Sequence, residues 1–304
     1  MSYRRIVGLG LCVVDHIYVV DRLDFANVRT RFTERLESAG GMTATALAQA
    51  AQLGCNTHVL SLVGNDPEGR RVRRTLRGAG VKTAGLRSST AAPTTVAVVL
   101  VERRSGERRF LVPDRRGLER RVPAFALELI DHGTILLVDG HFPAQALRAV
   151  RRARRVGATV VGDFNAPSPS SLKLLPFVDY AIVPEEFVQA YGAGSPKRTL
   201  RALRERFGGS PVITLGERGG VALIDGRVRE WRARKARVRD TTGAGDVFHG
   251  AFAAGLYHGF SPAASLDLAA RAAALCCTAL GGMGRLMRRG ELPTRAGRRG
   301  RRAR

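Results

Sequence analysis

The chain has 304 residues, of which 44% are hydrophobic, so it can bury a sizeable core and fits one large α/β domain, with or without a small lid. Its net charge of +24 favours anionic partners, nucleic acid among them, but arginines occur along the whole chain, which indicates a coding preference for arginine. No uncharged segment is long enough to span a membrane, and the four cysteines lack metal-type spacing, so we expect reduced core thiols in a cytoplasmic protein.

The N-terminal "RIVGLGLCVV" follows two basic residues and is predicted to be a buried first strand. It does not fit a signal peptide, because Asp15 and His16 interrupt the apolar run and no small-residue cleavage site follows. It does not fit a dinucleotide fingerprint either, because the third glycine is missing and a strand-like run continues where a helix should begin. We expect this strand to end at Asp15.

Strand-like and helix-like segments alternate along most of the chain. This alternation predicts a mainly parallel sheet with helices on both faces, and ligands at the carboxyl ends of its strands. Asp163 and Asn165, in "GDFN", follow one such strand and are candidate ligand contacts. Asp66 precedes Pro67 in "GNDPEGRRV", which predicts a helix N-cap with a structural role.

Two segments interrupt the alternation, at about residues 16–38 and 93–113. Both are predicted to be extended and not helical. The second contains Ser105 and Gly106 between two strand-like runs, which indicates a hairpin.

The stretch "DTTGAGDVFHGAFAAGL", residues 240–256, places small residues before a helical run. Gly243, Ala244 and Gly245 would let a ligand approach the backbone, and a helix starting near Gly245 would direct unpaired N–H groups and its positive dipole end to the same point. Asp246, in the first turn, could take a proton from an attacking hydroxyl. The alternative is that Thr242 and Asp246 only cap a tightly packed helix.

This stretch resembles the C-terminal signature of the ribokinase-like (pfkB) family of carbohydrate kinases, and similar segments span about residues 4–285. The resemblance implies a three-layer α/β/α sandwich with a mainly parallel central sheet and a small β-sheet lid. The kinase domain would cover residues 1–288, with lid segments 16–38 and 93–113. In the family the lid closes over the sugar and often forms the dimer interface, so a homodimer through the lid is expected.

The resemblance also assigns roles to residues at the acceptor side. Asp246 would be the catalytic base, and the amides of Gly243, Ala244 and Gly245 the anion hole. The sugar would be bound by four residues: Asp15, Gly40, Gly41 and Thr45. Asp15 also fits a turn or solvated aspartate, and the Gly-Gly pair a loop before a helix. The family usually has an asparagine where Thr45 stands, which puts the identity of the sugar in doubt.

On the donor side, "PVITLGERGG" resembles the family's nucleotide-binding strand and turn, with Thr214, Gly216 and Gly219 near ATP, although a simple hairpin would also fit. Glu186 matches a glutamate that positions Mg²⁺ through water, but Val183 replaces the family's asparagine, and the acidic pair in "PEEF" equally fits a helix N-terminus.

Asp240 and Thr241 match positions that bind a monovalent cation such as K⁺ in some relatives. The segment "LAARAAALCCTALGGMG" is similar to one that flanks adenine in the family, although helix packing would explain it equally well.

The expected function is an ATP- and Mg²⁺-dependent sugar kinase that transfers the γ-phosphoryl group to a hydroxyl. No Walker-type phosphate loop is present, so the start of the glycine-rich helix must hold the phosphates. One alternative is a kinase for a nucleoside or another small metabolite on the same fold. A more distant alternative is a nucleic-acid-binding protein that uses the basic tail at residues 289–304, which we expect to be disordered.

Overall fold

The computed structural model describes residues 3–23, 29–113, 122 and 124–292. Most of the predicted tail, residues 293–304, therefore lies outside the described residues, as do residues 24–28 of the first predicted lid segment.

Nine strands of the described residues form the central sheet, and all neighbouring pairs are parallel except the two at the β13 edge. Their spatial order is β13 (Arg227–Trp231), β12 (Gly220–Ile224), β11 (Val212–Thr214), β10 (Tyr180–Pro184), β9 (Thr159–Asp163), β8 (Thr134–Val138), β1 (Arg5–Leu9), β4 (Thr57–Gly64) and β5 (Leu86–Ser89).

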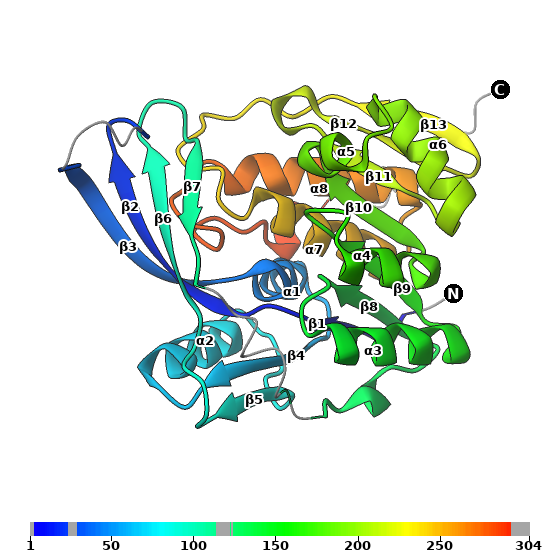
Figure 1. Ribbon diagram of the computed structural model, residues 1–304, viewed down its shortest axis with the longest axis horizontal. Coiled ribbons are helices and arrows are strands. Elements are labelled where there is room, and N and C mark those ends of the chain that lie inside the picture. The colour runs from blue at the N-terminus through cyan, green and yellow to red at the C-terminus, as the bar shows by residue number, and fades with distance from the viewer. Residues whose placement is uncertain (1–2, 24–28, 114–121, 123, 293–304) are drawn as a thin grey trace.

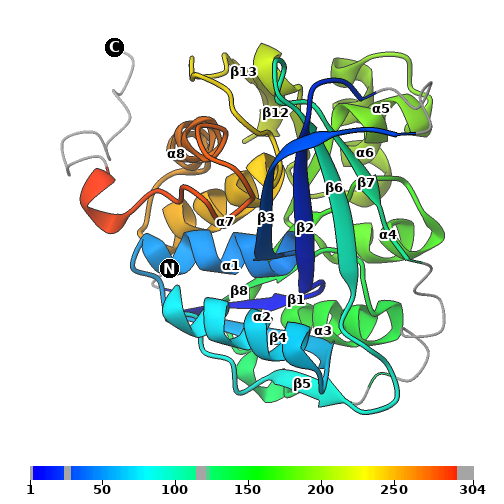
Figure 2. The same cartoon turned by 90° about the vertical axis from the view of Figure 1, so that its left-hand side faces the viewer.

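Helices cover both faces of this sheet, which confirms the three-layer prediction (Figure 1). They are α1 (Met42–Gln52), α2 (Pro67–Gly78), α3 (Pro143–Val156), α4 (Pro169–Leu174), α5 (Glu185–Tyr191), α6 (Pro196–Phe207), α7 (Ala244–Tyr257) and α8 (Pro262–Cys276). Short 3₁₀ turns are η2 (Leu127–Leu129), η3 (Leu175–Phe177), η4 (Gly216–Arg218) and η5 (Arg289–Glu291). Figure 2 shows α1, α7 and α8 on one side and α3 to α6 on the other.

The two faces of the sheet are built by side chains that alternate along each strand. In β1, Ile6 packs with the α1, α7 and α8 side chains, and the next residue, Val7, packs with those of α3 to α6. Since both faces are covered by helices, the inner strands are apolar throughout, as parallel strands usually are. Helix starts follow the predicted chemistry: the Asp66 carboxylate accepts a hydrogen bond from the Gly69 amide at 2.7 Å, and Pro67 occupies the first turn.

A second, four-stranded sheet stands beside the large one. Its spatial order is β3 (Phe32–Gly40), β2 (Val13–Val20), β6 (Val96–Glu102) and β7 (Arg108–Leu111). The two segments predicted to be extended supply these strands, and the β6–β7 hairpin turns at Ser105 and Gly106 as expected. Ile17, Val99 and Leu280 are among the buried residues that join this small sheet to the rest of the protein.

One predicted boundary is wrong: the first strand does not run on to Asp15. The chain leaves the large sheet after Leu9, and Asp15 lies within β2 of the small sheet. Gly10 lies where the chain leaves the large sheet. A side chain does not fit there, because a Cβ would lie 2.1 Å from the Asp139 carboxylate. The apolar run in the sequence continues through this point. Its periodicity alone therefore does not reveal that the run forms one strand in each of two sheets.

Helices α1 and α7 cross closely because small residues face each other. A Cβ on Gly250 would lie 2.1 Å from the Ala46 carbonyl oxygen. The run of small residues in α7 thus allows backbone contact with α1, and α7 also packs along α8. Within the described part of the chain, no helix is both long enough and apolar enough to cross a lipid bilayer.

Candidate active site

Polar residues converge where the parallel strands end. Asp139 directly follows β8, Asp163 ends β9, and the small sheet brings in Asp15 from β2. The first turn of α7 carries Asp246 to the same place, because the charges of neighbouring carboxylates, in addition to burial, raise the pKa values of Asp15, Asp163 and Asp246. The carboxyl edge of the sheet is therefore the candidate site, as parallel-sheet topology predicts.

The start of α7 is open to solvent and is built from glycine for two separate reasons. Gly243 is the N-cap with φ 74°, and a Cβ there would lie 2.5 Å from the Cα of Gly282, so neither its conformation nor its surroundings permit a side chain. Gly245 is exposed, and no atom lies within 4 Å of where its Cβ would be. The space in front of the helix dipole is thus free for a ligand, although the Ala244 amide donates to the Thr241 carbonyl at 3.3 Å.

Asp240 holds the approach to this helix. Its side chain is fully buried, and its two carboxylate oxygens accept hydrogen bonds from the amides of Thr242 and Gly281, each at 2.8 Å. These bonds join the irregular segment between β13 and α7 to the loop after α8. The observed role of Asp240 is therefore to position the loop that ends in Gly243.

At the acceptor side, the Gly-Gly pair lets the backbone approach Asp15. A Cβ on Gly40 would lie 1.9 Å from an Asp15 carboxylate oxygen, and Gly41 has φ 95° with the Leu11 carbonyl 2.7 Å from its would-be Cβ. Thr45 is buried one turn into α1, 3.5 Å from the position of a Cβ on Gly282. The residues expected to bind the sugar therefore lie on a connected surface that reaches the Gly243 turn.

The carboxyl groups of this site disfavour one another's charge. Burial, followed by the charges of Asp246 and Asp240, raises the pKa of Asp15 to about 7. Burial, followed by the charge of Asp163, raises the pKa of Asp246 to about 7 as well. A carboxyl group with its pKa near neutrality can both take up and release a proton, which suits a general base.

His249 and Asp163 form a buried pair beneath the first turn of α7. The His249 Nδ1 lies 2.7 Å from the Gly245 carbonyl oxygen, and its Nε2 lies 3.4 Å from Asp163 Oδ1. Burial raises the pKa of Asp163 well above its usual value and lowers the pKa of His249. The His249 Nε2 also lies 3.2 Å from the Ile182 carbonyl oxygen, so both ring nitrogens face backbone acceptors, and a neutral ring can donate to only one of them.

Asp139 was not among the predicted site residues. Its carboxylate accepts hydrogen bonds from the Leu11 amide at 2.7 Å, the Thr43 hydroxyl at 2.9 Å and the His141 amide at 3.0 Å. Asp139 thus joins the segment between β1 and β2, the first turn of α1 and the turn that follows β8. Its position directly after a buried strand, like that of Asp163, was the available sequence signal.

The predicted nucleotide side lies at the β11–β12 hairpin. Thr214 ends β11, and η4 follows with Gly216 at φ 57° and Gly219 at φ 88°. A Cβ on Gly219 would lie 2.0 Å from the Trp231 carbonyl oxygen. A Cβ on Gly216, in contrast, would have no neighbouring atom within 4 Å. Packing against β13 therefore explains Gly219, and Gly216 is the glycine that leaves open space.

Glu186 is exposed in the first turn of α5, beside Glu185, which pairs with Arg218. Asn165 lies at the strand edge, with its amide 3.6 Å from the Met42 sulfur. Among the described residues, no three acidic, histidine or cysteine side chains are arranged to hold a metal ion by themselves. These residues fit a magnesium ion that is held mainly by phosphate oxygens and water, with one or two carboxylates.

The small sheet docks on the irregular segment that leads into α7. Thr241 donates from its amide and its hydroxyl to the Gly106 carbonyl, at 3.2 and 2.9 Å, and Arg108 donates to the Thr241 hydroxyl at 2.7 Å. Arg239 also pairs with Glu34 of β3. The hairpin turn therefore lies against the residues directly before the Gly243 turn.

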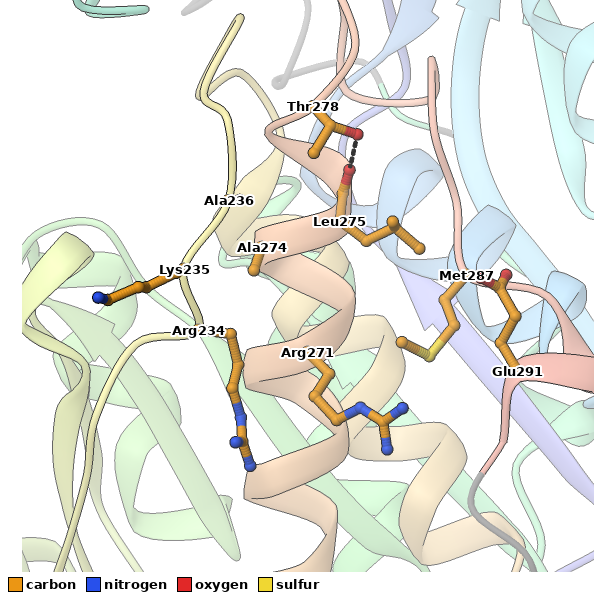
Figure 3. Close-up of a pocket in the computed structure, with 9 residues that line it drawn as sticks. All are labelled: Arg234, Lys235, Ala236, Arg271, Ala274, Leu275, Thr278, Met287 and Glu291. Carbon is orange, nitrogen blue, oxygen red and sulfur yellow. Dashed lines mark hydrogen bonds between the residues drawn. The ribbon is translucent and has the colours of Figure 1, made fainter.

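A separate cleft of about 450 Å³ runs along α8 (Figure 3). Arg234, Lys235 and Arg271 give it positive charge, and Met287 and Glu291 line its far side. The side chains of Arg234 and Lys235 are exposed, and Arg271, Ala274, Leu275 and Thr278 belong to the segment that the family resemblance predicts to flank adenine. The cleft is distinct from the acidic centre at the start of α7.

Comparison with known proteins agrees with this geometry. The family model described as pfkB family carbohydrate kinase matches residues 4–286. A ribokinase from Arabidopsis thaliana is 28% identical over 256 residues, which cover 78% of this chain and 66% of that protein.

Two solved structures share the fold. One, from Agrobacterium tumefaciens and proposed to be a ribokinase, has a TM-score of 0.86 at 26% identity and covers 95% of this chain and 96% of that chain. The other is Arabidopsis thaliana ribokinase complexed with ribose and ATP, with a TM-score of 0.79 at 22% identity. The match covers 95% of this chain and 97% of that chain.

The raised pKa of Asp15 predicts that this residue destabilises the folded protein at neutral pH. A carboxyl group with a higher pKa in the folded state favours folding below its unfolded pKa, and that contribution is lost as the pH rises towards 7. We expect Asp15→Asn to increase the free energy of unfolding by about 1–3 kcal/mol at pH 8 and to change it little at pH 4, as measured by urea denaturation.

Asp21→Asn is the matched control, since Asp21 lies beyond β2 with its side chain 75% exposed and pairs with Arg103. Its effect should stay within about 0.5 kcal/mol at both pH values. An Asp15→Asn variant that is less stable at pH 8 than the wild type would contradict the electrostatic assignment.

Proposed function

Since the chain belongs to the pfkB family of carbohydrate kinases, and is thus a phosphotransferase with an alcohol group as acceptor, we propose that it is an ATP-dependent sugar kinase with Asp246 as its base. The observation that carries this proposal is the half-buried Asp246 carboxyl, with its pKa raised to about 7, in the first turn of an open helix start. A base and an anion-binding turn then stand side by side.

In the proposed reaction, the acceptor hydroxyl loses its proton to Asp246 as its oxygen forms a bond to the γ-phosphorus of ATP. The bond from that phosphorus to the bridging oxygen breaks, and its electron pair leaves with ADP. The amides at Gly243 to Gly245 hold the negative charge that develops on the phosphoryl oxygens. Because Asp240 and the Gly282 contact hold this turn in place, it needs little reorganisation when the charge develops.

We place the sugar between the small sheet and α1. Asp15 offers carboxylate oxygens to paired hydroxyl groups, and the Gly40–Gly41 backbone leaves room for the ring beside it. Thr45 presents a hydroxyl on the same side. Asp139 belongs to the same edge of the sheet and keeps β1, β8 and α1 in register beneath the sugar.

We place ATP along the β11–β12 hairpin, with Thr214, Gly216 and Gly219 beside it and its γ-phosphoryl group at the start of α7. The related structure with ATP supports this donor. Magnesium would bridge the phosphate oxygens and offset their charge, with Glu186 acting through water. The four free cysteines fit a protein that works in the reducing cytoplasm.

Asp246→Asn should lower kcat by about 10²-fold or more, because asparagine cannot accept the hydroxyl proton, while ATP binding stays largely intact. In the wild type, turnover should fall as the pH drops below about 7, since protonation removes the base. The measurements are steady-state kinetics with ATP and ADP-release detection, and a titration of ATP binding to the variant.

Ribose, fructose, sugar phosphates and nucleosides form the acceptor panel, since a nucleoside kinase on the same fold is the alternative. Asp267→Asn, at an exposed position on α8, is the control and should keep wild-type turnover. Near-normal turnover of Asp246→Asn would remove the base from its proposed role.

We further propose a monovalent cation, such as K⁺, near Asp240. The Thr242 hydroxyl next to it is buried without a hydrogen-bond partner, which is a costly arrangement that a bound cation would relieve. Turnover should be several-fold higher in KCl than in choline chloride at equal ionic strength. Equal rates in the two salts would contradict this site.

We also propose that the small sheet forms a homodimer interface. Its apolar side chains Phe32, Phe110, Leu111 and Val112 are each about half exposed or more. Phe110→Asp combined with Leu111→Asp should convert a dimer to a monomer in light scattering, because it places charge in the apolar patch. Val228→Asp, on β13 at the far edge of the large sheet, should leave the mass unchanged. A monomeric wild type at micromolar concentration would rule this interface out.

A further inference from the structure

Arg108 is the positively charged side chain that the small sheet directs at the candidate site. It begins β7, two residues after the hairpin turn, and its guanidinium donates to the Thr241 hydroxyl at 2.7 Å. Thr241 lies two residues before Gly243, the N-cap of α7. The hydrogen bond therefore fixes the guanidinium against the chain segment that leads into the proposed anion hole.

The charges around the site agree with this placement. Burial raises the pKa values of Asp246, Cys276 and Cys277, and the positive charge of Arg108 opposes this rise in all three groups, which lie at the end of the α7–α8 pair that carries the anion hole. The guanidinium that donates to the Thr241 hydroxyl therefore also acts on the charge of Asp246. Arg108 remains exposed, so it keeps donors free for a ligand.

The balance of charge at the site calls for such a cation. Asp246 is faced by Asp163 from β9, Asp139 after β8 and Asp15 from β2, and by His249 from its own helix, whose pKa is lowered by burial. Arg108 from β7 is the guanidinium among the described groups that act on Asp246 most strongly. A phosphoryl group that carries negative charge would otherwise enter a cluster of carboxyl groups with only backbone amides to receive it.

We propose that Arg108 is a catalytic cation delivered by the small sheet: when the hairpin docks on Thr241, its guanidinium contacts the oxygens of the transferring phosphoryl group. This inference rests on the proposed kinase function. Arginine suits the role because its planar fork binds phosphate oxygens in pairs. Since the cation arrives only with the docked hairpin, the reaction becomes fast only after the acceptor is enclosed, which limits transfer of the phosphoryl group to water.

The central test compares Arg108→Gln, Arg108→Lys and Thr241→Val with the wild type, using ATP and Mg²⁺ with whichever acceptor of the sugar and nucleoside panel the wild type phosphorylates. Arg108→Gln should lower kcat by about 10²-fold or more while the KM for the acceptor changes little. Arg108→Lys should recover part of this loss, because it restores the charge without the fork. Thr241→Val removes the hydroxyl that accepts from the guanidinium and donates to the Gly106 carbonyl, and it should have a smaller effect of the same kind because the Thr241 amide still donates to Gly106.

The pH profile separates a catalytic cation from a structural latch. Asp246 must be unprotonated to act, and a nearby positive charge lowers its pKa. Removing that charge in Arg108→Gln should move the acidic limb of the kcat/KM profile to higher pH, by roughly 0.5–1 unit because the guanidinium is exposed. Arg103→Gln, in the same hairpin and paired with Asp21, is the control and should change neither the rate nor the profile.

Three outcomes would overturn the inference although the wild type phosphorylates an acceptor. The first is an unchanged kcat in Arg108→Gln. The second is a higher KM for acidic acceptors alone, which would make Arg108 a residue that recognises the acceptor. The third is a lower kcat with an unshifted acidic limb and no recovery by lysine, which would leave only a latch. A wild type that is inactive on the whole panel would instead refute the proposed function, and this inference with it.

Discussion

The buried carboxylate of Asp240 is the interaction on which the candidate site depends. It accepts amide hydrogen bonds from both the irregular segment before α7 and the loop after α8, so it brings Gly243 and Gly282 into backbone contact. That contact excludes any side chain at Gly243 and leaves the next turn open. An anion-binding turn built in this way is held by covalent chain geometry and two charge-assisted hydrogen bonds, and it requires no flexible side chain to form.

Around this turn the protein concentrates acidic groups at a cost in stability. Asp15 and Asp246 have pKa values near 7 because burial and the charges of neighbouring carboxylates disfavour their charged forms, and burial also raises the pKa of Asp163, which lies beside His249. Such clusters are typical of sites where a proton must move at neutral pH. The positive charge that offsets them comes from a different sheet, through Arg108, so the electrostatics of the site depend on how the small sheet is docked.

Much of the fold could be predicted from the sequence, because local patterns and tertiary structure agree. The segment Thr57–Gly64 is a strand, and the helix at Pro67–Gly78 starts at the predicted Asp66 cap. The glycines before α7 indicated an open helix start, which the structure confirms. Arg108 could not be found in this way, since several arginines flank the hairpin and only docking onto Thr241 singles it out. His249 likewise lies on an apolar helix face, and its partner Asp163 is distant in the chain.

The close crossing of α1 and α7 at Gly250 has an implication for how such a protein can diversify. One helix begins at the proposed sugar site and the other at the proposed phosphate site, and direct backbone contact restricts their movement relative to each other. The distance between acceptor and donor is therefore a constant of the scaffold. Adaptation to larger or differently charged acceptors then falls to the strands of the small sheet, which also carry Asp15 and Arg108. Specificity and catalysis are therefore linked, because both depend on how this one sheet docks.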